Sequence, residues 1–458
     1  MVETRSESEM IEGVRARMLE AISLRLRADV PVGVYLSGGI DSSVIAGMVV
    51  HLVKEQGARV GNDKETDRVT CFSIAFDEDS GFDESGMWPL MIHAAIAKML
   101  TSVKAIANRT AEHLNVKYIK KLMNEEELAK RFEDATWHCE HHNPDLNFVG
   151  KYALSEVPRA HGFKVVLTGE GADENFGGYP LYLPDYLRET DGAWPKGSLA
   201  ESQRQKQCDR TEHEAAKYYQ SVGADSKNRN SSVASRQLNN ITTVASMAAF
   251  SCTLWAPWTS CYGDCDPRET IANATDGRVR ELIMKKWHPL HSAEYIWTKG
   301  HLANIFLTCL GDRTEMAHSI EARTPFLDHY LTEYVNNLPP SVKIRYEPKD
   351  DRFIEKWILR EASKPFITTE LYERKKHPYS APTTWPAEGA LHKLMRKLIT
   401  QSNVEQLGFI DWRKTHGLVE RAFVDKDPLA LRFTLLVAEW VVLSQRFGVQ
   451  PAVRPEDL

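Results

Sequence analysis

Residues 32–43 decide the fold, and they read VGVYLSGGIDSS. The first five form a short apolar run rich in β-forming side chains, which the glycine pair closes. Residues 42–52 carry a helical pattern, and so do residues 9–27, whose apolar side chains fall on one face. These are Val14, Met18, Ala21, Ile22 and Leu26. The order helix, strand, glycine turn, helix predicts the start of an α/β fold with a parallel sheet.

Two further strands are predicted, over residues 69–76 and 164–167. The second runs directly into a glycine-rich and acid-rich turn at residues 168–174. In open parallel sheets, ligands bind outside the carboxyl ends of the strands. We therefore expect this turn and the turn after residue 36 to belong to one site.

The turn at residues 37–43 has the chemistry of a pyrophosphate cradle. Gly38 and Gly39 let the backbone approach phosphate oxygens, and the amides at the following helix start favour anions. Ser37 and Ser42 add hydroxyl donors, while Asp41 would repel phosphate unless it held Mg²⁺ against it. No Walker-type Gly-Lys-Ser/Thr follows, so we expect cleavage of ATP between the α and β phosphates. A plain strand–helix turn is the alternative.

The second turn, residues 168–174, places Glu170, Asp173 and Glu174 among glycines at a strand end. Three acids so close together repel one another unless a cation or a base shares them. The pattern favours Mg²⁺ binding or proton transfer, although bare turns also contain Asp and Gly.

Two further segments carry charge. In the first, Asp312, Arg313 and Arg323 precede the run 325–328, PFLD. Arginine can bind phosphate or carboxylate bidentately, but an ion-pair network bracing two helices is the alternative. The second is the basic run 374–377, RKKH, for which a solvated surface is the alternative.

Together these segments resemble the synthetase domain of B-type, glutamine-hydrolysing asparagine synthetases. Residues 82–84 and 145–148 are similar as well, and the resemblance covers nearly the whole chain. It implies a pyrophosphate-loop ATPase domain over residues 1–458. Within it we expect an α/β lobe at 9–186, an excursion with no clear pattern at 187–300, and a mostly helical C-terminal lobe at 301–447. Helical patterns cover residues 302–317, 352–362, 389–402 and 429–447.

The family resemblance also implies the reaction. ATP would adenylate the side-chain carboxylate of aspartate, and ammonia would attack β-aspartyl-AMP to give asparagine and AMP. By the same resemblance, Glu170 matches the acidic residue beside the acyl-adenylate, where a base can take a proton from the attacking amine. Lys376 matches the lysine that steadies negative charge on the phosphates and the tetrahedral intermediate. Asp41 and Asp173 match the Mg²⁺ ligands, and Asp312, Arg313 and Arg323 would manage substrate or phosphate charge. The matched ATP- and pyrophosphate-binding positions are Leu36, Ser37, Gly38, Gly39, Asp41, Ser42, Ile74 and Gly169.

The chain departs from the family pattern in two places. Position 2 is Val2, where the family's glutaminase domain begins with a cysteine, and only about thirty residues precede the first strand, too few for a domain. We therefore expect free ammonia, a separate glutaminase or a substrate amine as the nitrogen source, with a truncated gene as the alternative. The second departure is residues 86–104, GMWPLMIHAAIAKMLTSVK, whose removal leaves an unbroken family segment. We interpret this stretch as a retained intron, with a helical insertion as the alternative.

Composition excludes some partners. The formal net charge of -6 and the lack of a nucleic-acid-binding basic arm indicate no nucleic-acid partner. The apolar stretch 433–443 is short and contains Glu439, so we predict a buried helix and no membrane span. The polar, acidic start is unlike a secretory signal, which favours a cytoplasmic protein. Homo-oligomerisation stays open.

Three other functions stay open. One is another pyrophosphate-loop enzyme, such as a GMP or NAD synthetase, although the later motifs argue against it. Another is a related amide or lactam synthetase of secondary metabolism that acts on a different carboxylate. The third is a truncated or non-catalytic subunit.

Overall fold

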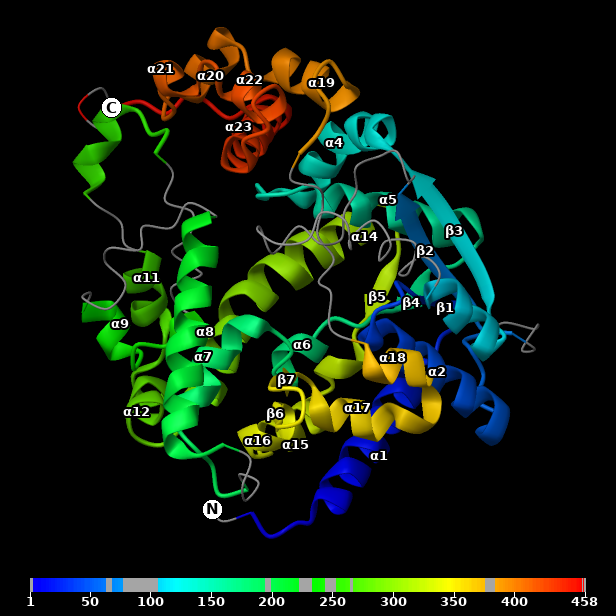
Figure 1. Cartoon of the computed structure of the whole chain (residues 1–458). Helices are drawn as coiled ribbons and strands as arrows, with labels where there is room; N and C mark the ends of the chain where they lie inside the picture. The colour runs from blue at the N-terminus through cyan, green and yellow to red at the C-terminus, as the bar shows by residue number, and fades with distance from the viewer. Residues whose placement is uncertain are drawn as a thin grey trace.

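A five-stranded parallel sheet lies on one side of the molecule (Figure 1). The computed structural model describes residues 3–62, 68–76, 106–193, 199–221, 233–243, 253–263, 267–374, 384–454 and 456. The strand order is β3-β2-β1-β4-β5, and every neighbouring pair is parallel. The strands are β1 (Val32–Tyr35), β2 (Thr70–Phe76), β3 (Lys117–Met123), β4 (Val165–Leu167) and β5 (Glu321–Arg323). The predicted α/β fold is confirmed.

The strand order reverses direction between β1 and β4. From β1 the chain adds β2 and then β3 toward one edge, and it returns to place β4 on the other side of β1. Val32 pairs with Val165, and Val34 pairs with Leu167. The two motif turns therefore leave neighbouring strands at the point where open α/β sheets bind ligands.

Helices α1 (Glu7–Arg25), α2 (Ile40–Gln56) and α17 (Trp357–Ser363) pack with the sheet around the first hydrophobic core. The face predicted for α1 is confirmed, because Val14, Met18, Ala21 and Ile22 are buried. Leu26, which follows the helix as its C-cap, is buried too. Ser6 caps the start of α1 in a reciprocal capping box with Glu9.

The C-terminal helices form a second core at one end of the molecule (Figure 1). They are α19 (Ala390–Leu398), α20 (Gln401–Leu407), α21 (Trp412–Thr415), α22 (Leu418–Phe423) and α23 (Pro428–Phe447). This core also includes side chains of α4 (Glu125–Cys139) and α5 (Asn147–Ala160). By length and composition alone α23 could cross a membrane, but 56% of its apolar window is buried inside the protein. Its packing is that of a core helix.

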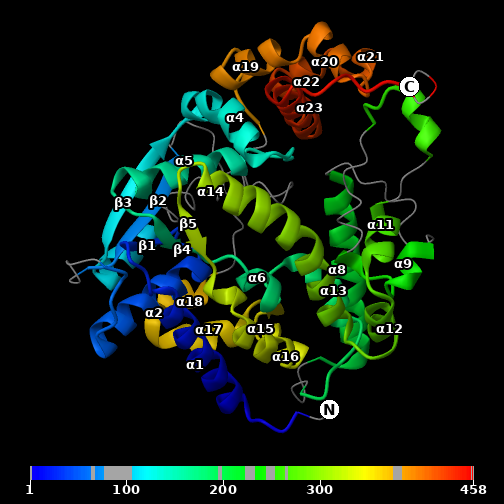
Figure 2. The ribbon, with the colours of Figure 1, turned by 180° about the vertical axis from the view of Figure 1, so that it is seen from behind.

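The stretch that lacked an apolar period, residues 187–300, contains helices around a third core. They are α8 (Glu201–Ser221), α9 (Val233–Gln237), α11 (Pro267–Ala274), α12 (Gly277–Lys285) and α13 (Pro289–Trp297), preceded by α7 (Leu183–Leu187). Both views place this group on the side of the molecule away from β3 (Figures 1 and 2).

Two predicted helices differ in detail. The helix predicted over 302–317 is a π-helix, η5 (Thr298–Arg313), which α14 (Thr314–Met316) continues. Within it the Thr308 hydroxyl donates to the Ala303 carbonyl, five residues back. The helix predicted over 352–362 was wrong at its start. Strand β7 (Arg352–Ile354) pairs there with β6 (Arg345–Glu347), and α17 begins only after Lys356, whose φ of 56° is left-handed.

The remaining elements are short. They are α6 (Ala172–Asn175), η2 (Pro180–Tyr182), η4 (Pro257–Tyr262), η6 (Pro325–Leu327), α15 (His329–Asn336), α16 (Pro340–Lys343), η7 (Lys364–Phe366) and α18 (Thr369–Glu373).

Candidate active site

The turn after β1 is braced by its own serines. The Ser37 amide donates to the Ser42 hydroxyl at 3.1 Å, and the two hydroxyls lie 3.0 Å apart. Gly38 has a φ of 81°, a conformation that glycine adopts without strain. No side chain caps α2 at Gly39. The amides of its first turn therefore face the end of the sheet, in the arrangement that binds anions elsewhere.

The acid-rich turn after β4 touches this first turn. A Cβ atom on Gly169 would lie 3.0 Å from the Asp41 Cβ and 3.1 Å from the Ser42 nitrogen. The turn is also tied to the 325–328 segment, because the Asn175 amide donates to the Phe326 carbonyl at 2.8 Å. Three of the motifs predicted from the sequence therefore come together in space.

One buried cation joins the two turns. The Lys356 Nζ lies 2.6 Å from Asp41 Oδ1 and 2.7 Å from Asp173 Oδ1. The side chain of Lys356 is only 1% exposed. Burial opposes its charge, but the carboxylates of Asp173 and Asp41 outweigh burial and raise the pKa of Lys356.

The donor set fits a magnesium ion that phosphates also hold. Asp41 and Asp173 offer hard carboxylate oxygens close enough for one ammonium nitrogen to reach both. Mg²⁺ is usually held by one or two carboxylates together with substrate phosphates and water. Within the described part of the chain, no group of three or more His, Cys, Asp or Glu forms a metal cage. The two aspartates alone make an incomplete site.

Glu170 lies beside a second cation, the half-buried Lys151. The Lys151 Nζ donates to Glu170 Oε1 at 2.8 Å and to Glu315 Oε1 at 3.0 Å, and the Thr168 hydroxyl also donates to Glu170. Glu315 is 1% exposed, whereas the side chain of Glu170 is 28% exposed. Burial raises the pKa of Glu315 against the opposing charge of Lys151. Glu170 is therefore the more accessible acid of the cluster and is held at two points.

The two predicted arginines contact backbone in this structure. Arg313 donates to the Cys139 carbonyl at the end of α4, at 2.9 Å. Arg323 donates to the carbonyls of Arg25 and Arg27 after α1, both at 2.8 Å. These contacts brace the ends of helices. Asp312, which directly precedes Arg313, is exposed. In this structure Arg313 and Arg323 therefore hold the ends of α4 and α1.

Arginines also line the approach to the first turn. The Arg374 Nη1 donates to the Gly38 carbonyl at 2.5 Å. Arg360 holds the carbonyls of Tyr372 and Arg374, at 2.7 and 3.0 Å. Lys376 lies outside the described residues, as do residues 82–84 and the stretch 86–104.

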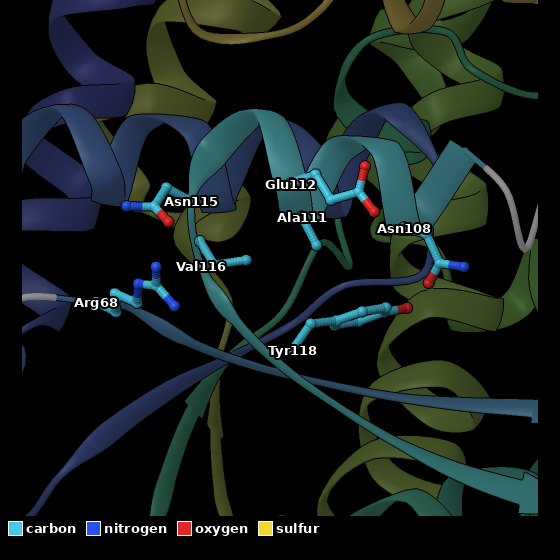
Figure 3. Close-up of a pocket in the computed structure, with 7 residues that line it drawn as sticks. All are labelled: Arg68, Asn108, Ala111, Glu112, Asn115, Val116 and Tyr118. Carbon is cyan, nitrogen blue, oxygen red and sulfur yellow. The ribbon is translucent and has the colours of Figure 1, made fainter.

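Leu36 directly follows β1, and Ile74 lies within β2, two residues before its end. Leu36 is fully buried, and Ile74 packs on the second core. A hollow of about 380 Å³ lies between the start of β3 and the helical residues 106–114 (Figure 3). The Tyr118 hydroxyl at its floor donates to the Leu36 carbonyl at 3.3 Å. Its lining contains none of the predicted site residues and consists of Arg68, Asn108, Ala111, Glu112, Asn115, Val116 and Tyr118.

Sequence reasoning missed Lys356 and Lys151. Lys356 stood inside a pattern interpreted as helix, where a lysine normally faces solvent. Lys151 lies on α5 between Phe148 and Ser155, one turn away on either side, and both are buried. A lysine on a buried helical face was the one signal that could have identified it.

Comparison with known proteins decides the family. Residues 13–98 and 102–440 match the family model described as asparagine synthase. The chain belongs to the asparagine synthase family. The family assignment made from the motifs is confirmed.

Curated relatives in this family carry two kinds of name. The chain is 45% identical to "Amidase chyE" of Penicillium rubens and 45% identical to "Amidase chry2" of Gibberella zeae, in each case over 98% of this chain and 64% of the relative. It is 24% identical to "Asparagine synthetase [glutamine-hydrolyzing] 1" of Bacillus subtilis, over 99% of this chain and 62% of the relative. The chain thus spans less than two thirds of the length of these relatives.

Proposed function

We propose that this chain is an ATP-dependent, amide-forming ligase that activates a carboxylate as its adenylate and transfers the acyl group to ammonia. One observation carries the proposal: Asp41 and Asp173, from turns far apart in the sequence, bracket a single cation where the strand order reverses. A site that handles the phosphates of a nucleotide needs this convergence of acids, backbone amides and cations.

Each part of the site has a role in this reaction. The amides and hydroxyls of Ser37–Ser43 would hold the pyrophosphate, and Asp41 and Asp173 would hold Mg²⁺, which neutralises phosphate charge. Glu170, which Lys151 and Thr168 contact, would accept a proton from the attacking amine. Arg374 and Lys376, on the segment after α18, supply positive charge for the leaving phosphates. Asp312, Arg313 and Arg323 are proposed to support the site through the helices they brace.

The identities favour a carboxylate other than aspartate. The chain shares 45% of aligned residues with proteins named amidases and 24% with an asparagine synthetase. We therefore place an asparagine-synthetase-like amide synthetase acting on another carboxylate first. Asparagine formation from aspartate, expected from the motifs, is the second candidate. The nitrogen source is proposed to be ammonia, either free or from a separate glutaminase.

The test combines two measurements on the purified chain. Carboxylate-dependent release of pyrophosphate from ATP is followed across a panel of carboxylates that includes aspartate, and the amide formed with ammonium is identified by mass spectrometry. Asp41→Asn should lower pyrophosphate release by about 10²-fold or more, because one arm of the cation site is lost. Asp209→Asn, at an exposed position on α8, is the matched control and should leave the rate unchanged.

Two results would contradict the proposal. One is pyrophosphate release by Asp41→Asn at the wild-type rate. The other is the absence of carboxylate-dependent pyrophosphate release with every member of a broad panel. If aspartate is the only carboxylate of the panel that supports turnover, the result would instead favour the second candidate.

A further inference from the structure

Lys356 occupies the space where the proposed function needs a metal. Its ammonium reaches Asp41 Oδ1 at 2.6 Å, Asp41 Oδ2 at 2.7 Å and Asp173 Oδ1 at 2.7 Å. A single protein cation therefore lies within hydrogen-bonding distance of both carboxylates.

The protein is built tightly around this lysine. A Cβ atom on Gly178 would lie 2.1 Å from Asp173 Oδ1 and 2.2 Å from the Lys356 Cε, so only glycine leaves room for the pair. Lys356 itself has a φ of 56°, which costs a non-glycine residue free energy and persists only where the surroundings fix it. The backbone conformation and the glycine together hold the ammonium between the two turns.

Charge decides what can enter such a site. Asp41, Asp173 and Lys356 sum to one negative charge, so a free Mg²⁺ entering beside the ammonium meets only two carboxylates that are already paired. The metal prefers six oxygens, and no third acid among the described residues joins the pair. Pyrophosphate or ATP brings both the missing oxygens and enough negative charge to accommodate two cations.

We propose that the Lys356 ammonium prevents a free divalent metal ion from binding to Asp41 and Asp173. Metal then binds there only together with the phosphates of the nucleotide. The inference rests on the proposed function. It adds that Lys356 selects the metal–nucleotide complex over the bare ion and is thus a positioning residue for the site.

The experiment measures metal binding directly, without turnover. Mn²⁺ replaces Mg²⁺, and loss of the free-ion electron paramagnetic resonance signal reports binding to the full chain, with and without inorganic pyrophosphate. The wild-type chain should bind Mn²⁺ only when pyrophosphate is present. Lys356→Met should gain binding of Mn²⁺ without pyrophosphate, with an affinity at least roughly tenfold above the weakest that the wild-type titration would detect, because the competing charge is gone.

Two matched variants separate this effect from general damage. Lys343→Met removes a different buried lysine, which is 0% exposed and 2.6 Å from Glu294, and should not gain Mn²⁺ binding. Lys356→Arg keeps the positive charge and should also bind no Mn²⁺ alone. If Lys356→Met does not fold, Lys356→Gln, which also removes the charge, takes its place with the same expected gain.

Tight binding of Mn²⁺ alone by the wild-type chain would overturn the inference, and so would a folded Lys356→Met variant with no gain. Either result leaves the proposed function standing, provided that Mn²⁺ with pyrophosphate binds. If neither pyrophosphate nor ATP binds with metal in any variant, the proposed function itself fails.

Discussion

At the scale of single residues, the site depends on two lysines that each join a pair of acids, one buried and one half-buried. Lys356 joins the two aspartates, and Lys151 joins Glu170 to Glu315. In each pair of acids the lysine offsets a repulsion that burial would otherwise make costly. These lysines hold the acids that the sequence motifs supply.

Replacing Lys151 by methionine should therefore destabilise the chain. Glu315, at 1% exposure, would lose its partner, and leaving one member of a buried ion pair alone costs about 3 kcal/mol. The pKa of Glu315, already raised by burial, would rise further. A carboxyl group whose pKa is higher in the folded than in the unfolded chain stabilises the folded state at pH values below its unfolded pKa. This stability is lost as the pH rises, so the variant should become less stable as the pH increases from about 4.5. Urea unfolding at several pH values measures this.

The double variant Lys151→Met/Glu315→Gln should recover most of that stability at neutral pH. Lys285→Met, which removes an exposed pair with Glu281, should cost at most about 0.5 kcal/mol and serves as the control. Equal stability of the single and double variants at all pH values would show that the Lys151–Glu315 contact is not the cause.

At the scale of elements, close approach between α2 and η7 fixes the helix that begins at the pyrophosphate turn. A Cβ atom on Gly47 would lie 2.1 Å from the Phe366 carbonyl oxygen, although no turn requires glycine there. Helix propensity favours alanine at this position by about 1 kcal/mol. A clash with backbone outweighs that preference, because the carbonyl cannot turn aside as a side chain can.

Gly47→Ala should accordingly lower the free energy of unfolding by about 1–3 kcal/mol. Gly277→Ala at the start of α12, where an added Cβ meets nothing within 4 Å, should be neutral or stabilising. Denaturant unfolding of both variants gives the comparison. A stabilised Gly47→Ala chain would mean that η7 moves away at little cost.

Elements with strong local patterns were predictable, and those set by tertiary contacts were not. The apolar face of α1 and the turn at residues 37–43 follow from side-chain period and glycine chemistry. Strand β3 carries three lysines and is exposed or half-buried along all but its last residue at the sheet edge, so it lacks the apolar run of a buried strand. Strand β5 has only three residues. The position of Lys356 depends on a left-handed residue that ends a hairpin, which no helical period reveals.

At the scale of the whole molecule, distant segments of the chain close the site. Asp41 and Lys356 are 315 positions apart, and Arg25 pairs with Asp328 at 2.9 Å across 303 positions. These contacts join α1, α2 and the 325–357 segment into one unit. An insertion or deletion between these contacting residues must therefore leave the elements on both sides of it in place.

The stretch 86–104 is the test case for such a change. It lies between β2, which ends at Phe76, and the helix at 106–114, where Ala107 packs against the pyrophosphate turn at Gly38. The connection has 29 residues, and it would have 10 without this stretch, closer to the usual length of connections in compact domains. The family model aligns residues up to 98 and resumes at 102, so it does not by itself mark the stretch as an insertion.

We expect most mature transcripts to lack the codons for residues 86–104, because Gly86-Met87-Trp88 can encode the splice-donor sequence GTATGT and Met99-Leu100-Thr101 can encode a CTAAC branch point. Sequencing of the transcript checks this directly. The shortened chain should keep β2 and the helix at 106–114 in place, and it should release pyrophosphate from ATP at least as fast as the full chain. Retention of these codons in most messages, or loss of pyrophosphate release on their deletion, would instead establish the stretch as a working part of the enzyme.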